Sequence, residues 1–147
     1  MSPLDLSRNP PRGPREKMLG VYFLPRTIDK IRAQFPGGSL GGYVVDFPRG
    51  FTVFVLNKIG IELAELKGAV AEANDESEVA EWIRARADLS SVEELNRRIE
   101  SFTIERLSPE ERAMVVTFHP VCKQRPELTR FFDIFEADDA LTAAGSA

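Results

Sequence analysis

The sequence predicts an all-α fold, a compact orthogonal bundle of six to seven short helices with an extended N-terminal arm. Apolar residues recur at intervals of three and four in successive short stretches, and no stretch alternates convincingly between apolar and polar residues. Proline, glycine and capping residues separate these stretches, so each predicted helix is short and apolar on one side. Short one-sided helices need several partners, which favours an orthogonal bundle over an up-down bundle of longer helices.

The chain of 147 residues is expected to form a single helical domain over residues 14–141. A chain of this length buries enough surface to fold without a metal or a disulfide. Residues 1–13 form the expected arm, because their prolines remove backbone donors and hold preceding residues in extended conformations. Residues 142–147 are expected to be a frayed tail.

The first helix is expected to begin at Pro25, because the fixed φ of proline suits a first helical turn. Ile28, Ile31 and Phe35 follow on one face, and a Pro-Gly-Gly sequence ends the helix. The glycine-rich loop over residues 38–42 lacks the lysine with which a P-loop binds phosphate. A phosphate cradle is therefore not the favoured interpretation of these glycines.

Residues 48–59 fit a helix and, in part, a strand. Phe51, Phe54 and Ile59 fall on helical spacing, whereas two β-branched valines within the segment would also suit a strand. We expect a helix that ends at Gly60, where glycine would adopt a left-handed conformation.

An apolar stripe over residues 63–73 predicts the next helix, and three capping signals predict the beginnings of three more. Each signal combines a capping residue with a glutamate three positions later, as a capping box requires. These pairs are Asp75 with Glu78, Ser91 with Glu94, and Ser108 with Glu111. The third is the clearest, because Pro109 occupies the first helical position, and its helix must end before Pro120.

Three phenylalanines, Phe131, Phe132 and Phe135, dominate the last predicted helix, which is expected to begin at Pro126. At about 100° per residue, the apolar side chains of this helix cover an arc of roughly 160°, wider than the minimal core-facing stripe of roughly 100°. Burial in the core is the ordinary interpretation of such an arc. The alternative is a homodimer contact in which Phe132 forms the exposed edge.

Composition limits the environment and the partners of the protein. The net charge is −4 and the isoelectric point about 5.1, and the basic residues are not interleaved with aromatic ones, so nucleic acid is not an expected partner. The polar N-terminus lacks the apolar core of a signal peptide, and the longest nearly apolar run, residues 51–56, is too short to span a membrane. We expect a cytoplasmic protein without a membrane partner or a cofactor.

Basic residues are concentrated near the N-terminus. Residues 8–32 contain seven basic and two acidic side chains, a local net charge of +5, whereas the rest of the chain carries −9. The candidate ligand-binding residues are Arg15, Arg26, Asp29 and Lys30. The last three share the first predicted helix, and Arg15 would join them if the arm folds back. Because arginine binds carboxylates and phosphates through two parallel hydrogen bonds, these residues predict a site for a small anionic ligand.

The alternative interpretation of the same residues is structural. In that case Asp29 forms surface ion pairs with Arg26 and Arg32, and the remaining basic residues balance acidic helices of the same chain. Surface pairs of this kind contribute little free energy and need no ligand.

His119 and Cys122 are the only histidine and the only cysteine, and they lie three residues apart. A thiol-dependent enzyme could use His119 as the base, and the charges of Lys123 and Arg125 would lower the pKa of the thiol. A metal site is not expected, because there is no second histidine or cysteine to complete it. A buried structural cysteine is the alternative.

Four short motifs stand out within residues 5–100. They are Arg-Gly-Pro-Arg-Glu-Lys at 12–17, Leu-Pro-Arg-Thr-Ile-Asp-Lys-Ile-Arg-Ala at 24–33, Gly-Gly-Tyr at 41–43 and Asp-Glu-Ser-Glu-Val-Ala-Glu-Trp at 75–82. Together they resemble a bacterial domain family of unknown function, numbered 5069. The resemblance implies a small helical protein of bacterial origin and transfers no catalytic residue. Residues 47–51 depart from the family pattern, which more often has an acidic residue followed by apolar ones there.

The sequence therefore favours a non-enzymatic binding or interaction module with a basic, anion-binding surface near its N-terminus. The competing hypothesis is a small thiol-dependent enzyme that uses Cys122 and His119. Whether the protein has any catalytic activity is left open by the sequence.

Overall fold

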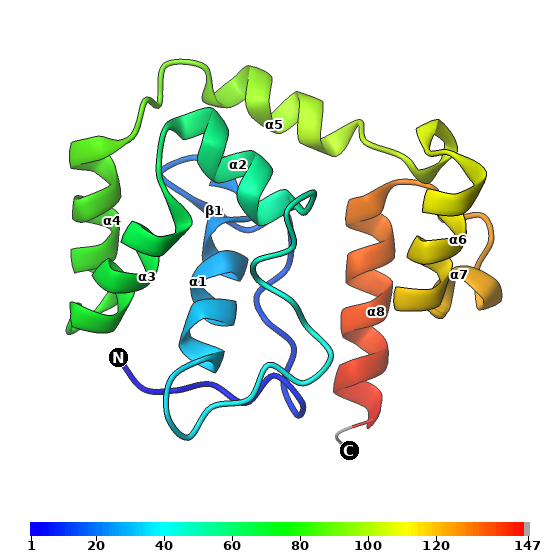
Figure 1. Cartoon of the computed structure of the whole chain (residues 1–147), viewed down its shortest axis with the longest axis horizontal. Coiled ribbons are helices and arrows are strands. Elements are labelled where there is room, and N and C mark those ends of the chain that lie inside the picture. The colour runs from blue at the N-terminus through cyan, green and yellow to red at the C-terminus, as the bar shows by residue number, and fades with distance from the viewer. Residues whose placement is uncertain (146–147) are drawn as a thin grey trace.

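The computed structural model describes residues 1–145, and most of them are helical (Figure 1). The helices are α1 (Leu24–Ala33), α2 (Phe51–Ile59), α3 (Leu63–Glu72), α4 (Glu76–Arg86), α5 (Val92–Glu100), the 3-10 helix η1 (Ile104–Arg106), α6 (Pro109–Phe118), α7 (Val121–Gln124) and α8 (Phe131–Gly145). Two short strands, β1 (Lys17–Met18) and β2 (Val21–Tyr22), form a hairpin. The predicted all-α class is confirmed in its main feature, and the hairpin is an addition to it.

Helix α1 lies in the middle of the molecule (Figure 1). Helices α3 and α4 lie on one side of it in this view, α2 lies between it and α5 along one edge, and α6, α7 and α8 form the end opposite α4 (Figure 1). Helix α1 contacts α2, α3 and β1 directly. This central position buries nearly all of α1, including polar and charged side chains.

The β1–β2 hairpin is absent from the sequence-based prediction, because two residues per strand are too few to show an alternating pattern. Its antiparallel pairs are Lys17 with Tyr22 and Met18 with Val21. The turn residues Leu19 and Gly20 both have positive φ angles, 52° and 78°, the combination that type I′ hairpin turns require. The hairpin leads directly into Phe23, the N-cap of α1.

The N-terminal arm lies against the body of the protein. Asp5 forms an isolated parallel bridge with Ser39, and the amide of Leu6 donates to the carbonyl of Ser39 at 2.8 Å. Leu6 is buried. At Gly41, which has a φ of 58°, a Cβ atom would lie 2.9 Å from the backbone of Ser7, so this contact requires glycine. The glycine-rich loop therefore serves here as a docking site for the arm.

Buried apolar residues form two clusters. The larger one joins the hairpin, α1 to α5 and Phe132, and the smaller one joins η1, α6, α7 and Ile134. Helix α8 contributes to both, because Phe132 and Ile134 lie on different sides of it. This double role explains why the apolar arc of the last helix is so wide.

Phe132 is 1% exposed, so its expected position at an exposed edge is wrong. Its ring packs against those of Phe23, Phe51 and Phe135. Phe131 and Phe135 are only partly buried and pack against the two clusters. A homodimer stays a prediction, but its contact would have to use residues other than Phe132.

Most of the predicted helix ends agree with the structure, and one predicted cap does not. The Ser108 capping box is confirmed, because the Ser108 side chain accepts from the amide of Glu111 and the Glu111 side chain accepts from the amide of Ser108. Asp75 caps α4 by accepting from the amide of Glu78. Ser91 makes no side-chain bond to α5, so this predicted capping box is wrong. The helix over residues 51–59 and the left-handed Gly60, with a φ of 79°, are confirmed.

The last helix begins at Phe131 rather than at Pro126. The chain just before it pairs with the segment after α5, where Ile104 donates its amide to Thr129 and Phe131 donates to Phe102. This pairing holds the residues before α8 out of a helix. At its other end α8 continues through Gly145, so residues 142–145 are helical rather than frayed, and 146–147 lie outside the described residues.

Within residues 1–145, every helix is too short or too polar to cross a membrane.

Candidate functional site

Helix α1 combines near-complete burial with a polar sequence. Its buried side chains include Arg26, Thr27, Asp29 and Lys30. Removing charged groups from water is unfavourable unless they gain partners or lose their charge. The partners of these four side chains therefore show which of them serve the fold and which remain free to bind something else.

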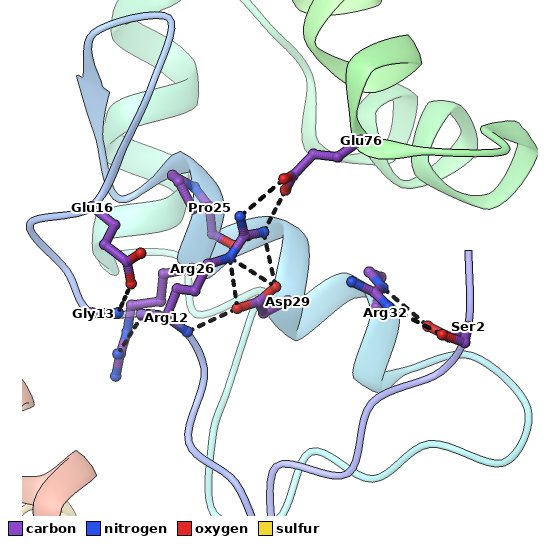
Figure 2. A network of polar contacts seen from close by, with 9 residues as sticks. All are labelled: Ser2, Arg12, Gly13, Glu16, Pro25, Arg26, Asp29, Arg32 and Glu76. Carbon is purple, nitrogen blue, oxygen red and sulfur yellow. Dashed lines mark hydrogen bonds and ion pairs between the residues drawn. The ribbon is translucent and has the colours of Figure 1, made fainter.

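Asp29 is held by the arm. Arg12 donates to its carboxylate from the backbone amide at 2.8 Å and from Nη2 at 3.0 Å (Figure 2). On its other side the Arg12 guanidinium contacts Glu76 at the start of α4 (Figure 2). Burial alone would lower the pKa of Arg12, but the hydrogen bonds to Glu76 and Asp29 outweigh it and raise that pKa above its ordinary value.

The predicted surface pairing of Asp29 with Arg26 and Arg32 is therefore wrong. Asp29 is buried and pairs with Arg12, while Arg32 donates from Nε to the backbone carbonyl of Ser2 at 3.0 Å (Figure 2). The reason is the arm, which folds back along α1 and brings Arg12 to Asp29 from outside the helix.

A surface groove of about 400 Å³ runs beside this pair, between the arm, α1 and the start of α4. Arg12, Asp29 and Glu76 lie in its wall, where the single positive charge of Arg12 is paired with two carboxylates, so the three side chains together carry a net negative charge. The groove therefore offers a ligand little charge that is not already paired.

Arg26 pairs with a residue that the sequence analysis did not single out. Its guanidinium donates to both carboxylate oxygens of Asp139 on α8, at 2.6 and 3.1 Å, and Arg26 is only 3% exposed. The Tyr43 hydroxyl donates to the same carboxylate at 2.9 Å. The Nε–H of Arg26 is buried and has no hydrogen-bond partner among residues 1–145.

Lys30, one turn after Arg26, is 8% exposed and makes no side-chain hydrogen bond or ion pair within the described chain. Its ammonium lies 5.2 Å from the ring centroid of Phe23. Burial, the largest cause, and the charge of Arg26 together lower the pKa of Lys30 to about 7, against the opposing effect of Asp139. Thr27 bonds to Thr52 at 3.0 Å, so Lys30 is the one of the four polar α1 residues whose side chain lacks a polar partner.

Phe23 adopts an unusual backbone conformation to reach this position. Its φ of 76° lies in the left-handed region, which is uncommon for an aromatic residue and costs free energy. The conformation places its ring beside Lys30 and 5.8 Å from the guanidinium carbon of Arg26. Arg26 also lies over the rings of Tyr43 and Phe135.

We call this group the α1 cation cage. It consists of Phe23, Arg26, Lys30, Tyr43, Phe135 and Asp139. Three aromatic rings and the Asp139 carboxylate contact Arg26, and the ring of Phe23 also lies beside Lys30.

Arg15 lies outside the cage. It donates to Glu100 and Asp133, also contacts Glu136, and lies over the ring of Phe132. Side-chain hydrogen bonds to Glu100, the largest effect, raise the pKa of Arg15 above its ordinary value. These contacts tie the segment between the arm and β1 to α5 and α8. Of the four predicted ligand-binding residues, the structure thus brings together Arg26 and Lys30, while Asp29 and Arg15 pair elsewhere.

His119 and Cys122 meet a third group, Asp138. The Nδ1 atom of His119 contacts the Asp138 carboxylate, and the amide of Cys122 donates to the carbonyl of His119 at 3.0 Å. No side-chain hydrogen bond joins Cys122 to His119 in the described part of the chain. His119 is therefore not positioned to take the proton from the Cys122 thiol.

The expected lowering of the thiol pKa by Lys123 and Arg125 is wrong. Burial raises the pKa of Cys122, and the negative charge of Asp138 raises it further. Both basic side chains are exposed, where solvent screens them, and Arg125 pairs with Glu127. Across residues 1–145, no group of three or more histidine, cysteine, aspartate or glutamate side chains is placed to hold a metal ion.

Comparison with protein-family models identifies the family of the chain. The profile of a family described as "Domain of unknown function (DUF5069)" matches residues 8–141. The matched range continues past residue 100, the end of the region whose motifs resemble this family. It includes every residue of the α1 cation cage. A search of the curated proteins finds no significant match.

Proposed function

The chain belongs to the DUF5069 family, a domain of unknown function, and we propose that it is a binding module that holds a small anion in the α1 cation cage. The observation that carries the proposal is the Arg26 Nε–H, a buried donor without a hydrogen-bond partner among residues 1–145, one helical turn before Lys30, which is itself 8% exposed and makes no side-chain hydrogen bond there. Buried donors without partners are rare in proteins, and each calls for an explanation.

Charge supports an anion rather than a neutral ligand. The cage contains two basic groups, Arg26 and Lys30, and one carboxylate, Asp139, so it carries a net positive charge when Lys30 is protonated. A bound anion would supply the missing counter-charge and accept from both free donors. Charge-assisted hydrogen bonds of this kind are roughly twice as strong as neutral ones.

The size of the ligand follows from burial. Arg26 and Lys30 expose only a small part of their surface, and aromatic rings lie beside them. Such an enclosure suits inorganic phosphate or a short carboxylic acid better than a nucleotide. Bacterial origin and a cytoplasmic location stay predictions alongside this proposal.

The thiol-enzyme alternative has less support. The raised pKa of Cys122 and the absence of a hydrogen bond from Cys122 to His119 both disfavour a thiolate nucleophile.

Thermal unfolding with and without anions tests the proposal. Wild-type protein is measured with phosphate, acetate and propionate at 1 mM, against chloride at the same ionic strength. An anion bound with a Kd of about 10 μM would then add about 2.7 kcal/mol to the free energy of unfolding. We expect at least one of the small anions to stabilise the protein.

Two lysine variants show whether the effect comes from the cage. Lys30→Met removes the free ammonium and should abolish the stabilisation by the anion. Lys58→Met is the matched control, because Lys58 also lies over an aromatic ring, Phe54, but is exposed on α2. The proposal fails if no anion stabilises the wild type, or if Lys30→Met responds to anions as the wild type does.

A further inference from the structure

The fold leaves several large apolar side chains uncovered. Among residues 1–145, those that expose about half of their surface or more are Val44, Phe47, Met114, Phe118 and Leu141. Four of them lie on α6 and on the loop before α2, and the fifth lies near the end of α8. Phe118 is the most exposed, at 67%. Exposed apolar side chains that form a contiguous patch mark interaction sites on soluble proteins.

The loop before α2 and helix α6 are bound to the same turn of α8. Tyr43 of the loop and His119 at the end of α6 contact two consecutive aspartates of α8. Val44 directly follows Tyr43 in the chain, and Phe118 directly precedes His119. Both exposed residues are therefore held beside this turn of α8.

A second contact joins the loop to α6 directly. Arg49 pairs with Glu111, in the first turn of α6, at 3.5 Å. Phe47 lies two residues before Arg49, and Met114 lies about one helical turn after Glu111. The loop and α6 thus bring four exposed apolar residues to one side of the molecule. We call them the α6–loop surface, which consists of Val44, Phe47, Met114 and Phe118.

Helix α6 turns part of its apolar sequence away from the core. None of its residues is buried, and Val115 and Val116 are the ones that pack against the smaller cluster. At about 100° per residue, Met114 lies about 200° from Val116 and hence on the outer side of the helix. Phe118 follows Met114 by four positions and shares that side. The outer side of α6 therefore carries an apolar stripe that nothing within residues 1–145 covers.

We propose that the α6–loop surface is the contact of a homodimer in which the α6 helices of two copies pack antiparallel across a two-fold axis near Met114. Two exposed charges favour a second copy as the partner. Glu110 lies in the first turn of α6, Lys123 lies just past its end, and neither forms an ion pair in the described part of the chain. In an antiparallel pair, Glu110 of each copy meets the end of α6 that carries Lys123 in the other. A two-fold interface requires this kind of self-complementarity.

The exposed area is sufficient for such a contact. The four side chains of the α6–loop surface expose roughly 400 Å² together, taking about 150–250 Å² for a whole large side chain. A dimer interface of ordinary size covers about 800 Å² on each partner, and about 65% of a homodimer interface is apolar. The surface therefore supplies most of the apolar area that a dimer needs, and the neighbouring charged side chains would form its rim.

Sedimentation velocity between about 5 and 500 μM tests the inference. Interfaces of ordinary size bind in the micromolar range or tighter, so we expect a dimer with a Kd of about 10 μM or less. Phe118→Asp should be monomeric and should keep the helical circular dichroism of the wild type, because Phe118 is mostly exposed. Ala85→Asp is the control, because it adds the same charge at an exposed position of α4, at the opposite end of the molecule (Figure 1), and should leave the dimer intact.

Charge exchange tests the antiparallel arrangement without touching the apolar residues. Glu110→Lys and Lys123→Glu should each weaken the dimer by about tenfold, because like charges then meet at both ends of the α6 pair. An equimolar mixture of the two variants should form a dimer about as tightly as the wild type, since opposite charges meet again at both ends. Loss of folding cannot produce this recovery.

Three results would overturn the inference. They are a wild type that stays monomeric up to about 500 μM, a folded Phe118→Asp that still forms the dimer, and a mixture of the two charge variants that associates no more tightly than either variant alone. The inference does not rest on anion binding, so Lys30→Met should form the same dimer as the wild type.

Discussion

Arg12 and Lys30 show two ways in which a buried basic residue is accommodated beside the same helix. Arg12 lies between Asp29 and Glu76, so two carboxylates balance its charge and raise its pKa. Lys30 has no such partner, and its pKa is lowered instead. Burial of a charge is thus relieved by a partner in one case and by loss of a proton in the other. Only the second arrangement leaves a group free for a ligand.

The pH dependence of stability should reveal Lys30 directly. In the unfolded chain the lysine stays protonated up to about pH 10.4, whereas in the folded protein it loses its proton near pH 7. Below pH 7 the lysine is charged in both states, and its burial lowers the stability by the full amount. Between pH 7 and 10 unfolding takes up a proton, so this destabilisation shrinks as the pH rises.

Lys30→Met should therefore be more stable than the wild type by about 2–5 kcal/mol at pH 6, and the difference should vanish towards pH 10.5. Chemical denaturation at pH 6, 8 and 10 measures it, and Lys58→Met should follow the wild type throughout. A Lys30→Met curve parallel to that of the wild type at all three pH values would contradict the lowered pKa.

Cys122 should be unreactive in the folded protein. It is 7% exposed, and burial together with Asp138 raises the pKa of its thiol, so little thiolate is present at neutral pH. We expect iodoacetamide to label Cys122 quickly in denaturant and at most slowly without it, at pH 7 to 8. Rapid labelling of the native protein, with a titration below pH 8.5, would restore the thiol-enzyme hypothesis.

Part of the candidate site could be predicted from single residues. The sequence predicts that Arg26 and Lys30 lie close together, because they are four positions apart in a basic, helical stretch. Asp139 lies four positions after Phe135 and seven after Phe132, so helical spacing could have placed it on the buried face of α8. Tyr43 lies in an irregular loop, where no periodicity shows which way a side chain points. Contacts between distant segments, such as that of Arg12 with Asp29, leave no local signal at all.

At the scale of the elements, prediction succeeded where a local interaction determines the structure. The capping residues of α4 and α6 and the left-handed Gly60 make contacts within a few residues of themselves, so the sequence nearby is sufficient. Each strand of the β1–β2 hairpin has two residues, which is too few to show the alternation of apolar and polar residues that predicts a strand. The start of α8 depends on pairing with the segment after α5, which lies more than 25 residues earlier in the chain.

The two serines at predicted helix starts give a test at this scale. Ser108→Ala removes both the side-chain acceptor and its part in the capping box, so it should lower the free energy of unfolding by about 1 kcal/mol. Ser91→Ala removes no bond to α5 and should change it by a few tenths of a kcal/mol at most. Urea denaturation measures the free energy of unfolding of both variants. If both substitutions lower it by the same amount, the capping hydrogen bonds of Ser108 do not stabilise α6.

Over the whole molecule, α8 connects the two apolar clusters. Phe132 belongs to the larger cluster and Ile134 to the smaller one, and Asp139 on the same helix pairs with Arg26 of α1. Arg15 adds a further link by joining the segment between the arm and β1 to α5 and α8. Because one rigid helix contributes to both clusters, neither can lose its packing without disturbing the other. We therefore expect the protein to unfold in one cooperative transition.

Trp82 provides a probe that is remote from the smaller cluster. It is the single tryptophan, it lies on α4, and it packs against the larger cluster at the opposite end of the molecule from α6 and α7 (Figure 1). Ile134→Ala removes buried methyl groups from the smaller cluster and should cost about 3 kcal/mol, and Ile134→Val about 1 kcal/mol. If α8 couples the clusters, both variants shift the unfolding midpoint seen by Trp82 fluorescence as far as the midpoint seen by far-ultraviolet circular dichroism. A Trp82 transition that stays at the wild-type midpoint while the circular dichroism splits into two steps would show that α6, α7 and η1 unfold as a separate unit.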